Sequence, residues 1–122
     1  MASRARPLSL GAALAALAAC APVDGPRLDG LDPAAARRGA TVTLTGRDLC
    51  GGTATATGAC DPLPSGAVDF GLSPPMVRAP VRSWADAEIR VTVPSQVAAG
   101  ATSVYVTVDG RTSNALDFEV LP

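Results

Sequence analysis

Two stretches decide the fold: Ile-Arg-Val-Thr-Val at residues 89–93 and Ser-Val-Tyr-Val-Thr-Val-Asp-Gly at residues 103–110. Apolar residues alternate with polar or amphipathic ones in both, which is the period of a strand with one buried face. Asp109-Gly110 is a strong hairpin signal, because a type I′ turn needs positive φ at both central residues. The strand that ends at Val108 is therefore predicted to pair with the strand through Phe118.

The same alternation recurs along the chain, and no helical period is sustained. Pro80 has no N–H to donate to a sheet, which favours an edge position for its strand. Two short segments, 33–38 and 95–99, are each predicted to form one helical turn that acts as a connector. Seven strands are expected: Arg27–Leu31, Thr41–Thr45, Ala67–Phe70, Met76–Ser83, Ile89–Val93, Ser103–Val108 and Leu116–Val120.

From Gly25 to Leu121 the chain resembles the IPT/TIG domain, a family found in bacterial surface proteins, plexin-type receptors and some transcription factors. The resemblance implies an all-β, immunoglobulin-like sandwich of two sheets over residues 27–122, with Phe70, Trp84 and Phe118 as core bulk. The matching residues are Pro26, Leu28, Leu31, Asp32, Pro33, Gly39, Val42, Thr43, Leu44, Thr45, Gly46, Leu49, Val68, Phe70, Gly71, Trp84, Asp86, Ile89, Val91, Val93, Pro94, Gly100, Val104, Val106, Val108, Gly110, Ser113, Asn114 and Phe118.

The first nineteen residues are predicted to be a signal peptide. Arg4 and Arg6 precede an apolar segment from Leu8 to Ala19 that is too short to span a bilayer. It ends in Leu-Ala-Ala-Cys at 17–20, which resembles a bacterial lipobox. The resemblance implies cleavage before Cys20, a lipid on the Cys20 thiol, and a short tether over residues 20–26. The alternative is ordinary secretion, because Ala19-Cys20-Ala21 also fits a small-residue cleavage site that would remove Cys20.

Composition narrows the possible functions of the exported part. Its 103 residues suit one domain, and eight arginines against eleven acidic residues give a net charge of −3, the wrong sign for nucleic acid. The chain has no His and no Lys, so a Ser-His-Asp triad and a Schiff base are impossible. A calcium site at Asp29 and Asp32 is conceivable, but the sequence there has no loop of alternating acidic ligands. No enzyme activity, cofactor or metal is expected.

Cys50 and Cys60 are predicted to form a disulfide in an oxidising compartment. Closing their ring would restrict the unfolded chain by about 2.5 to 3 kcal/mol. A zinc site is the alternative, although two thiols without His supply only half a tetrahedral shell. Eighteen residues separate Leu49 from Val68, where the family has a short connection. This insertion is either a tolerated, stapled loop or a contact surface.

The expected function is that of a non-catalytic lipoprotein of the bacterial envelope. The lipid on Cys20 would hold it to a membrane, and the sandwich would bind an envelope protein or serve as a structural module. Ala21 is not the Asp that signals inner-membrane retention, so the outer membrane is favoured, on either its periplasmic or its surface face. The alternative is a carbohydrate-binding accessory module, for which Trp84 and Tyr105 are the aromatic candidates.

Overall fold

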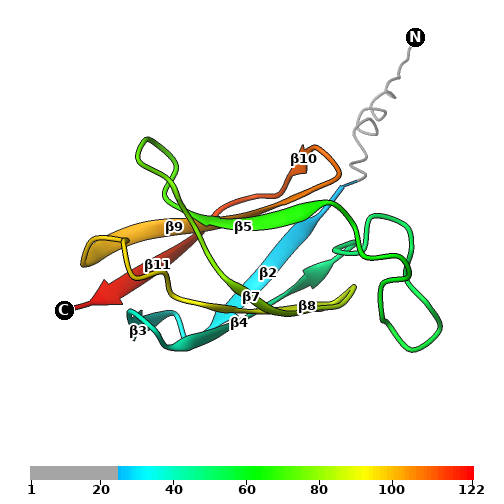
Figure 1. Cartoon of the computed structure of the whole chain (residues 1–122), viewed down its shortest axis with the longest axis horizontal. Coiled ribbons are helices and arrows are strands. Elements are labelled where there is room, and N and C mark those ends of the chain that lie inside the picture. Colours follow the sequence, from blue (N-terminus) through cyan, green and yellow to red (C-terminus); the bar gives the residue numbers. More distant parts are fainter. Residues whose placement is uncertain (1–24) are drawn as a thin grey trace, which may run out of the picture.

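The computed structural model describes residues 25–122, which form ten strands in two packed sheets and no helix (Figure 1). The predicted all-β sandwich is confirmed, and it is consistent with an immunoglobulin-like fold. One sheet has the order β2 (Arg27–Asp32), β4 (Thr41–Arg47), β8 (Glu88–Thr92), β7 (Val81–Trp84). The other has the order β3 (Ala35–Arg37), β11 (Leu116–Leu121), β9 (Gly100–Val108), β5 (Gly66–Phe70), β6 (Val77–Arg78), with β10 (Arg111–Thr112) also paired to β9.

The alternating apolar residues fill the layer between the sheets. In β9, for example, Val104, Val106 and Val108 are buried, while the residues between them are partly exposed. The rings of Phe70 and Phe118 meet edge to face with their centroids 5.4 Å apart. Such pairs stabilise a core beyond the area that they bury. Both aromatic residues are therefore the core bulk that the sequence predicted.

The turn at Asp109-Gly110 forms as predicted. Asp109 has φ 48° and Gly110 has φ 85°, and Arg111 pairs with Val108 across the two-residue loop. Farther along the chain, β11 pairs antiparallel with β9, with Leu116 opposite Val104. The prediction that the strand ending at Val108 pairs with the strand through Phe118 is confirmed.

The two predicted helical turns are wrong. Residues 35–37 form β3, which pairs in parallel with β11 and places Ala36 in the core. Residues 95–99 form turns without a helix. In the first segment, hydrogen bonds to β11 replace the local helical bonds that alanine favours. The second segment is an irregular connection.

The predicted single strand Met76–Ser83 is divided between the two sheets. Its first half, β6, pairs with β5, and its second half, β7, pairs with β8. At the crossing, the Ala79 N–H donates to the Val68 carbonyl of one sheet at 2.9 Å, and the Pro80 carbonyl accepts from the Thr92 N–H of the other at 2.9 Å. Pro80, which has no N–H, stands where the chain leaves one sheet for the other.

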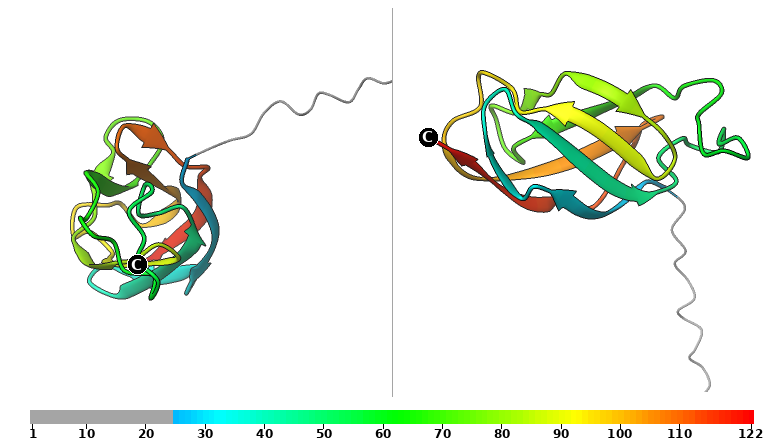
Figure 2. Two further views of the ribbon diagram at one scale, coloured as in Figure 1. Left: turned by 90° about the vertical axis from the view of Figure 1, so that its right-hand side faces the viewer. Right: turned by 90° about the horizontal axis from the view of Figure 1, so that it is seen from below.

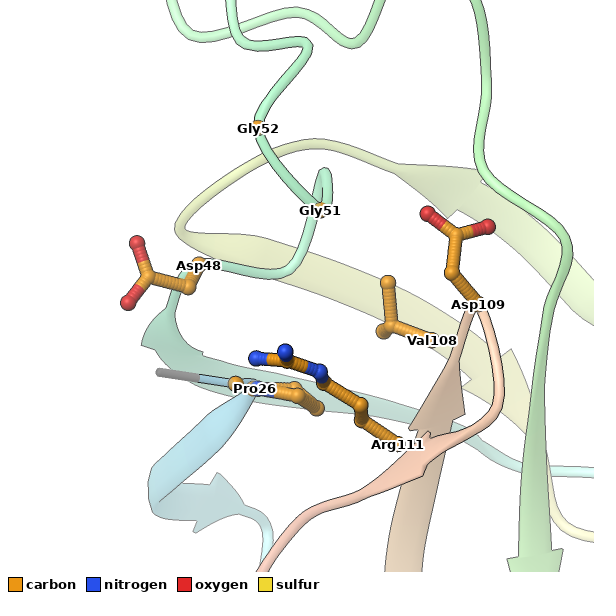
Figure 3. A pocket seen from close by; sticks show the side chains of 8 residues that line it. Pro26, Asp48, Gly51, Gly52, Val108, Asp109 and Arg111 are labelled. Atoms are coloured by element: carbon orange, nitrogen blue, oxygen red, sulfur yellow. The ribbon is translucent and has the colours of Figure 1, made fainter. Parts of the chain in front are cut away.

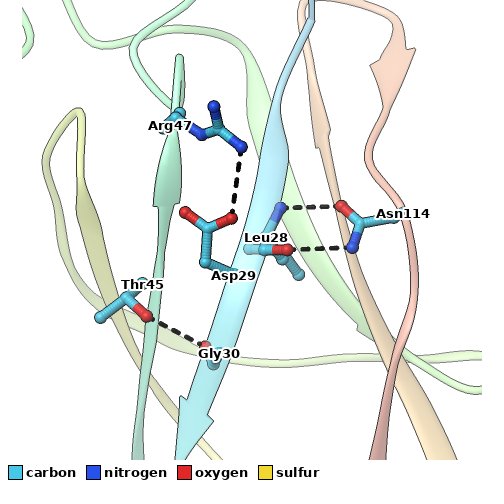
Figure 4. Close-up of polar contacts among 6 residues, drawn as sticks. All are labelled: Leu28, Asp29, Gly30, Thr45, Arg47 and Asn114. Carbon is cyan, nitrogen blue, oxygen red and sulfur yellow. Dashed lines mark hydrogen bonds and ion pairs between the residues drawn. The ribbon is translucent and has the colours of Figure 1, made fainter.

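Asn114 lies in the segment just before β11 and bonds to the free edge of β2 (Figure 4). Its carboxamide oxygen accepts from the Leu28 N–H at 2.8 Å, and its nitrogen donates to the Leu28 carbonyl at 2.9 Å. Thus one side chain satisfies both backbone groups of an edge residue, as a neighbouring strand would. On the same strand Asp29 pairs with Arg47 at 3.5 Å.

The sandwich has two distinct ends (Figure 2). The N-terminal end holds the start of β2, the projecting connection 48–65 and the turn at Asp109-Gly110. Gly25, Gly51 and Asp109 line one hollow at this end. At the opposite end lie the connections 71–76 and 93–99 and the C-terminus. The N-terminal end thus gathers the insertion and the start of the domain.

Candidate functional site

The predicted signal peptide and Cys20 lie outside the described residues. The first described residue, Gly25, is five positions after Cys20. Within residues 25–122 the structure contains no helix that is long and apolar enough to cross a membrane.

The structure joins Cys50 to Cys60 in a disulfide whose Cα atoms are 5.2 Å apart. Cys50 is fully buried, whereas Cys60 is partly exposed. Both sulfurs are used in this bond, so they are not zinc ligands in this state. We call residues 50–60 the disulfide loop.

The disulfide loop is folded by its own hydrogen bonds. Thr55 and Ala59 are joined by a backbone bond of 2.7 Å, and the Asp61 N–H donates to the Thr53 carbonyl at 3.0 Å. The Thr53 hydroxyl lies 3.0 Å from the Cys50 carbonyl and 2.8 Å from the Pro62 carbonyl. The insertion is therefore a small structured unit, because several of its backbone groups find partners within it.

The turn between β7 and β8 holds the disulfide loop against the sandwich. The Asp86 carboxylate accepts from the Cys50 N–H at 3.1 Å, and the Asp86 N–H donates to the Gly58 carbonyl at 2.9 Å. The Trp84 indole N–H donates to the Leu49 carbonyl at 2.6 Å, and its ring packs against the core. Trp84 is therefore a structural residue here, as the core prediction expected.

Asp86 and Glu88, two neighbouring carboxylates, have different partners. Asp86 is half-buried and holds the disulfide loop through its bond to the Cys50 N–H. Glu88 only approaches Arg90, at 3.9 Å. The described residues contain no group of three or more Cys, Asp or Glu side chains placed to hold a metal ion.

A hollow of about 440 Å³ opens at the N-terminal end (Figure 3). Its walls come from the start of β2, the disulfide loop and the β9–β10 turn, and Arg111 lies beside Pro26 within it. Asp109 forms another wall, where its carboxylate accepts from the Ser65 N–H at 3.0 Å. The hollow thus mixes a guanidinium with carboxylates and is partly open to solvent.

A second hollow, of about 380 Å³, opens at the opposite end. Leu72, Pro75 and Val77 line one side, and Val97 and Ala99 line the other. None of its lining residues is charged. Its polar side chains are the hydroxyls of Ser73, Thr102 and Ser103 and the carboxamide of Gln96.

The outer face of the six-stranded sheet carries a row of polar groups around Tyr105. The Tyr105 hydroxyl donates to the Met76 sulfur at 3.4 Å, and Asp69 lies opposite Tyr105 on β5. Asp69 is buried and accepts from Arg78 at 3.0 and 3.4 Å. This leaves Tyr105 as the aromatic side chain on an outer face, whereas Trp84 packs inward.

The hydrogen bond from Asp69, reinforced by its charge, raises the pKa of the Arg78 guanidinium above its ordinary value. A raised pKa means that the stabilisation is complete below the ordinary pKa of arginine and is lost only as pH rises through the raised one. The titration of Arg78 therefore contributes no pH dependence near neutrality. Arg78 is largely exposed, so solvent screening keeps its contribution small.

No family model matches this chain, and no curated protein matches it. One solved structure with a similar backbone is described as "Putative phosphatase" from Bacteroides thetaiotaomicron, with 12% identity and a TM-score of 0.48. The match covers 81% of this chain and 18% of that protein, so the chain spans less than a fifth of its length. At this identity and score, we draw no function from the likeness.

Sequence reasoning missed two hollows and two long-range polar pairs. It did not foresee the hollow at either end, because hollows form where connections from distant strands meet. It also did not pair Asn114 with Leu28 or Asp69 with Arg78. The Asp69 position carried a signal: a carboxylate within a strand between Val68 and Phe70 needs a partner.

Proposed function

We propose that this chain is a non-catalytic bacterial envelope lipoprotein whose sandwich acts as a protein-binding or structural module close to the membrane. The observation that carries the proposal is the Leu-Ala-Ala-Cys at 17–20, placed seven residues before the first strand at Arg27. The disulfide supports an exported location, since disulfides persist in oxidising compartments. We further propose the outer membrane as its site and IPT/TIG as its family.

The short tether restricts where such a domain could act. Six residues, Ala21 to Pro26, reach at most roughly 20 Å. A lipid on Cys20 would therefore hold the N-terminal end of the sandwich near the membrane. A partner would be a neighbouring envelope component within this reach.

Metabolic labelling tests the lipid anchor. Cells that express the chain are grown with a radiolabelled fatty acid, and the Cys20→Ser variant is the control. Label on the wild-type protein and its loss in the variant are expected, because the lipid needs the thiol. Unlabelled, processed wild-type protein in the soluble fraction would instead favour the secreted alternative.

Crosslinking tests the partner. Envelopes are treated with a short crosslinker, and the complexes are purified through the wild-type chain and through Cys20→Ser. We expect one or more envelope proteins with the wild type and far fewer with the variant. Repeated recovery of the chain alone would count against a binding role. Density fractionation of the same envelopes tests the outer-membrane location.

The alternative function is a carbohydrate-binding accessory module, and Tyr105 on an outer face is the observation that favours it. Sugars stack on exposed aromatic rings, and a glycan array would detect such binding. Tyr105→Ala should abolish it, whereas Thr107→Ala, two residues along the same face, should not. Absence of any glycan signal from the wild-type chain would remove this alternative.

A further inference from the structure

We propose that the disulfide loop and Leu63 form a second contact with the bilayer that carries the lipid of Cys20. The inference rests on the proposed lipidation and deepens it, since it states which surface of the sandwich faces the membrane. It gives the insertion a role as a membrane-contacting surface, in addition to the lipid anchor and apart from the core of the sandwich.

The position of the loop is the first step. The loop projects from the N-terminal end, where β2 begins (Figure 2). Gly51 and Gly52 line the same hollow as Gly25 and Pro26. Since the chain between Cys20 and Gly25 is at most roughly 20 Å long, the loop lies next to the point at which the lipid would enter the bilayer.

The chemistry of the loop is the second step. No residue from Leu49 to Cys60 is charged, and the residues from Ala54 to Thr57 are exposed. Leu63, just beyond the loop, has 65% of its surface exposed. Charged groups are costly at the edge of the hydrocarbon region, whereas small, hydroxyl and aliphatic side chains are tolerated there.

The rigidity of the loop is the third step. Several of its backbone groups bond to one another and to the β7–β8 turn, and these bonds can persist when the loop contacts lipid. The disulfide keeps the loop in this shape without the membrane. A tethered, preformed surface needs little intrinsic affinity, because the lipid anchor raises its local concentration at the bilayer.

The surrounding charges define which lipid surface fits. The loop itself has no charged residue, and Asp48 and Asp61 flank it in the sequence. Asp109 and Arg111 line the hollow that it borders, so carboxylates outnumber guanidinium groups there. The contact is therefore with the neutral part of the headgroup region, and anionic lipid should not strengthen it. It should also be insensitive to salt, in contrast to a polybasic membrane contact.

Two leucines at opposite ends of the sandwich give a matched test. Leu63 is 65% exposed at the N-terminal end, and Leu72 is 63% exposed at the opposite end. The full lipidated protein is purified as Leu63→Trp and as Leu72→Trp and is reconstituted into neutral phosphatidylcholine vesicles with brominated acyl chains. Trp84 provides the same background fluorescence in both variants.

Quenching by bromine is the measurement. We expect Leu63→Trp to lose at least twice the fraction of its added emission that Leu72→Trp loses, at both low and high salt. Equal quenching, or stronger quenching of Leu72→Trp, would overturn the inference. Mass spectrometry of the same samples distinguishes failure of the proposed lipidation from failure of this contact. A missing acyl chain contradicts the proposed function itself. An acylated but unquenched Leu63→Trp contradicts only the contact of the loop with the bilayer.

Discussion

At the scale of single residues, Asn114 shows how a side chain replaces a missing strand. Leu28 stands on the free edge of β2, where its N–H and carbonyl point away from β4 toward Asn114 (Figure 4). Edge strands expose unpaired backbone groups to other chains. Asn114 bonds to both of these backbone groups of Leu28. It thereby links β2 to the segment that leads into β11 of the other sheet.

Asn114→Ala should therefore destabilise the sandwich. Both Leu28 groups would lose their partners in a partly buried site, which costs about 1 to 3 kcal/mol. Urea unfolding followed by fluorescence gives the change in midpoint. Thr112→Ala, an exposed change on β10, should stay within about 0.5 kcal/mol of wild type; an equal loss in both variants would refute the role of Asn114.

Some residue roles followed from sequence and others did not. Phe70 and Phe118 stood at inward positions of alternating strands, so their burial was predictable. Asp86 was not, because its partner, the Cys50 N–H, belongs to an insertion that alternation does not describe. Local patterns report which face a residue occupies, and a long-range polar pair depends on how connections fold back.

At the scale of elements, the β9–β10 turn requires a left-handed backbone. Gly110 has φ 85°, and open space surrounds the position of a Cβ there. Gly110→Val should cost about 1 to 2 kcal/mol, because a β-branched residue is strained in this region. Gly110→Asn should cost less, since Asn adopts it more readily. Thermal unfolding would rank the two, and the reverse order would contradict the turn assignment.

The disulfide loop makes a second prediction at this scale. Replacing both Cys50 and Cys60 by Ser should lower the free energy of unfolding by about 3 kcal/mol, because the open chain regains the conformational freedom of the ring. Reduction of the wild type should produce a similar shift. The double variant is the control for the reductant, and a further shift in that variant would mean that the reductant acts elsewhere.

Elements were predictable where their pattern was strong. The strands of the core and the Asp109-Gly110 hairpin formed as expected. The alanine-rich segment 34–36 did not form a helical turn, because parallel bonds to β11 outweigh a single turn of local ones. The division of residues 76–83 between sheets was also hidden, since alternation alone does not say which sheet a strand joins.

At the scale of the whole molecule, residues 25–122 contain one continuous core that both sheets share. The protein should therefore show a β-type circular dichroism spectrum and unfold in one cooperative transition. Spectra and tryptophan fluorescence recorded through the same urea series would check this. A helical spectrum, or two separate transitions, would contradict the architecture.

The segment that passes from β6 to β7 has a consequence for degradation. Since adjoining residues Ala79 and Pro80 belong to different layers, neither layer can peel away while the other stays intact. A protease would find no half-open form to trim from the body of the sandwich. Its access would depend on complete unfolding, so turnover of this domain should follow global stability alone.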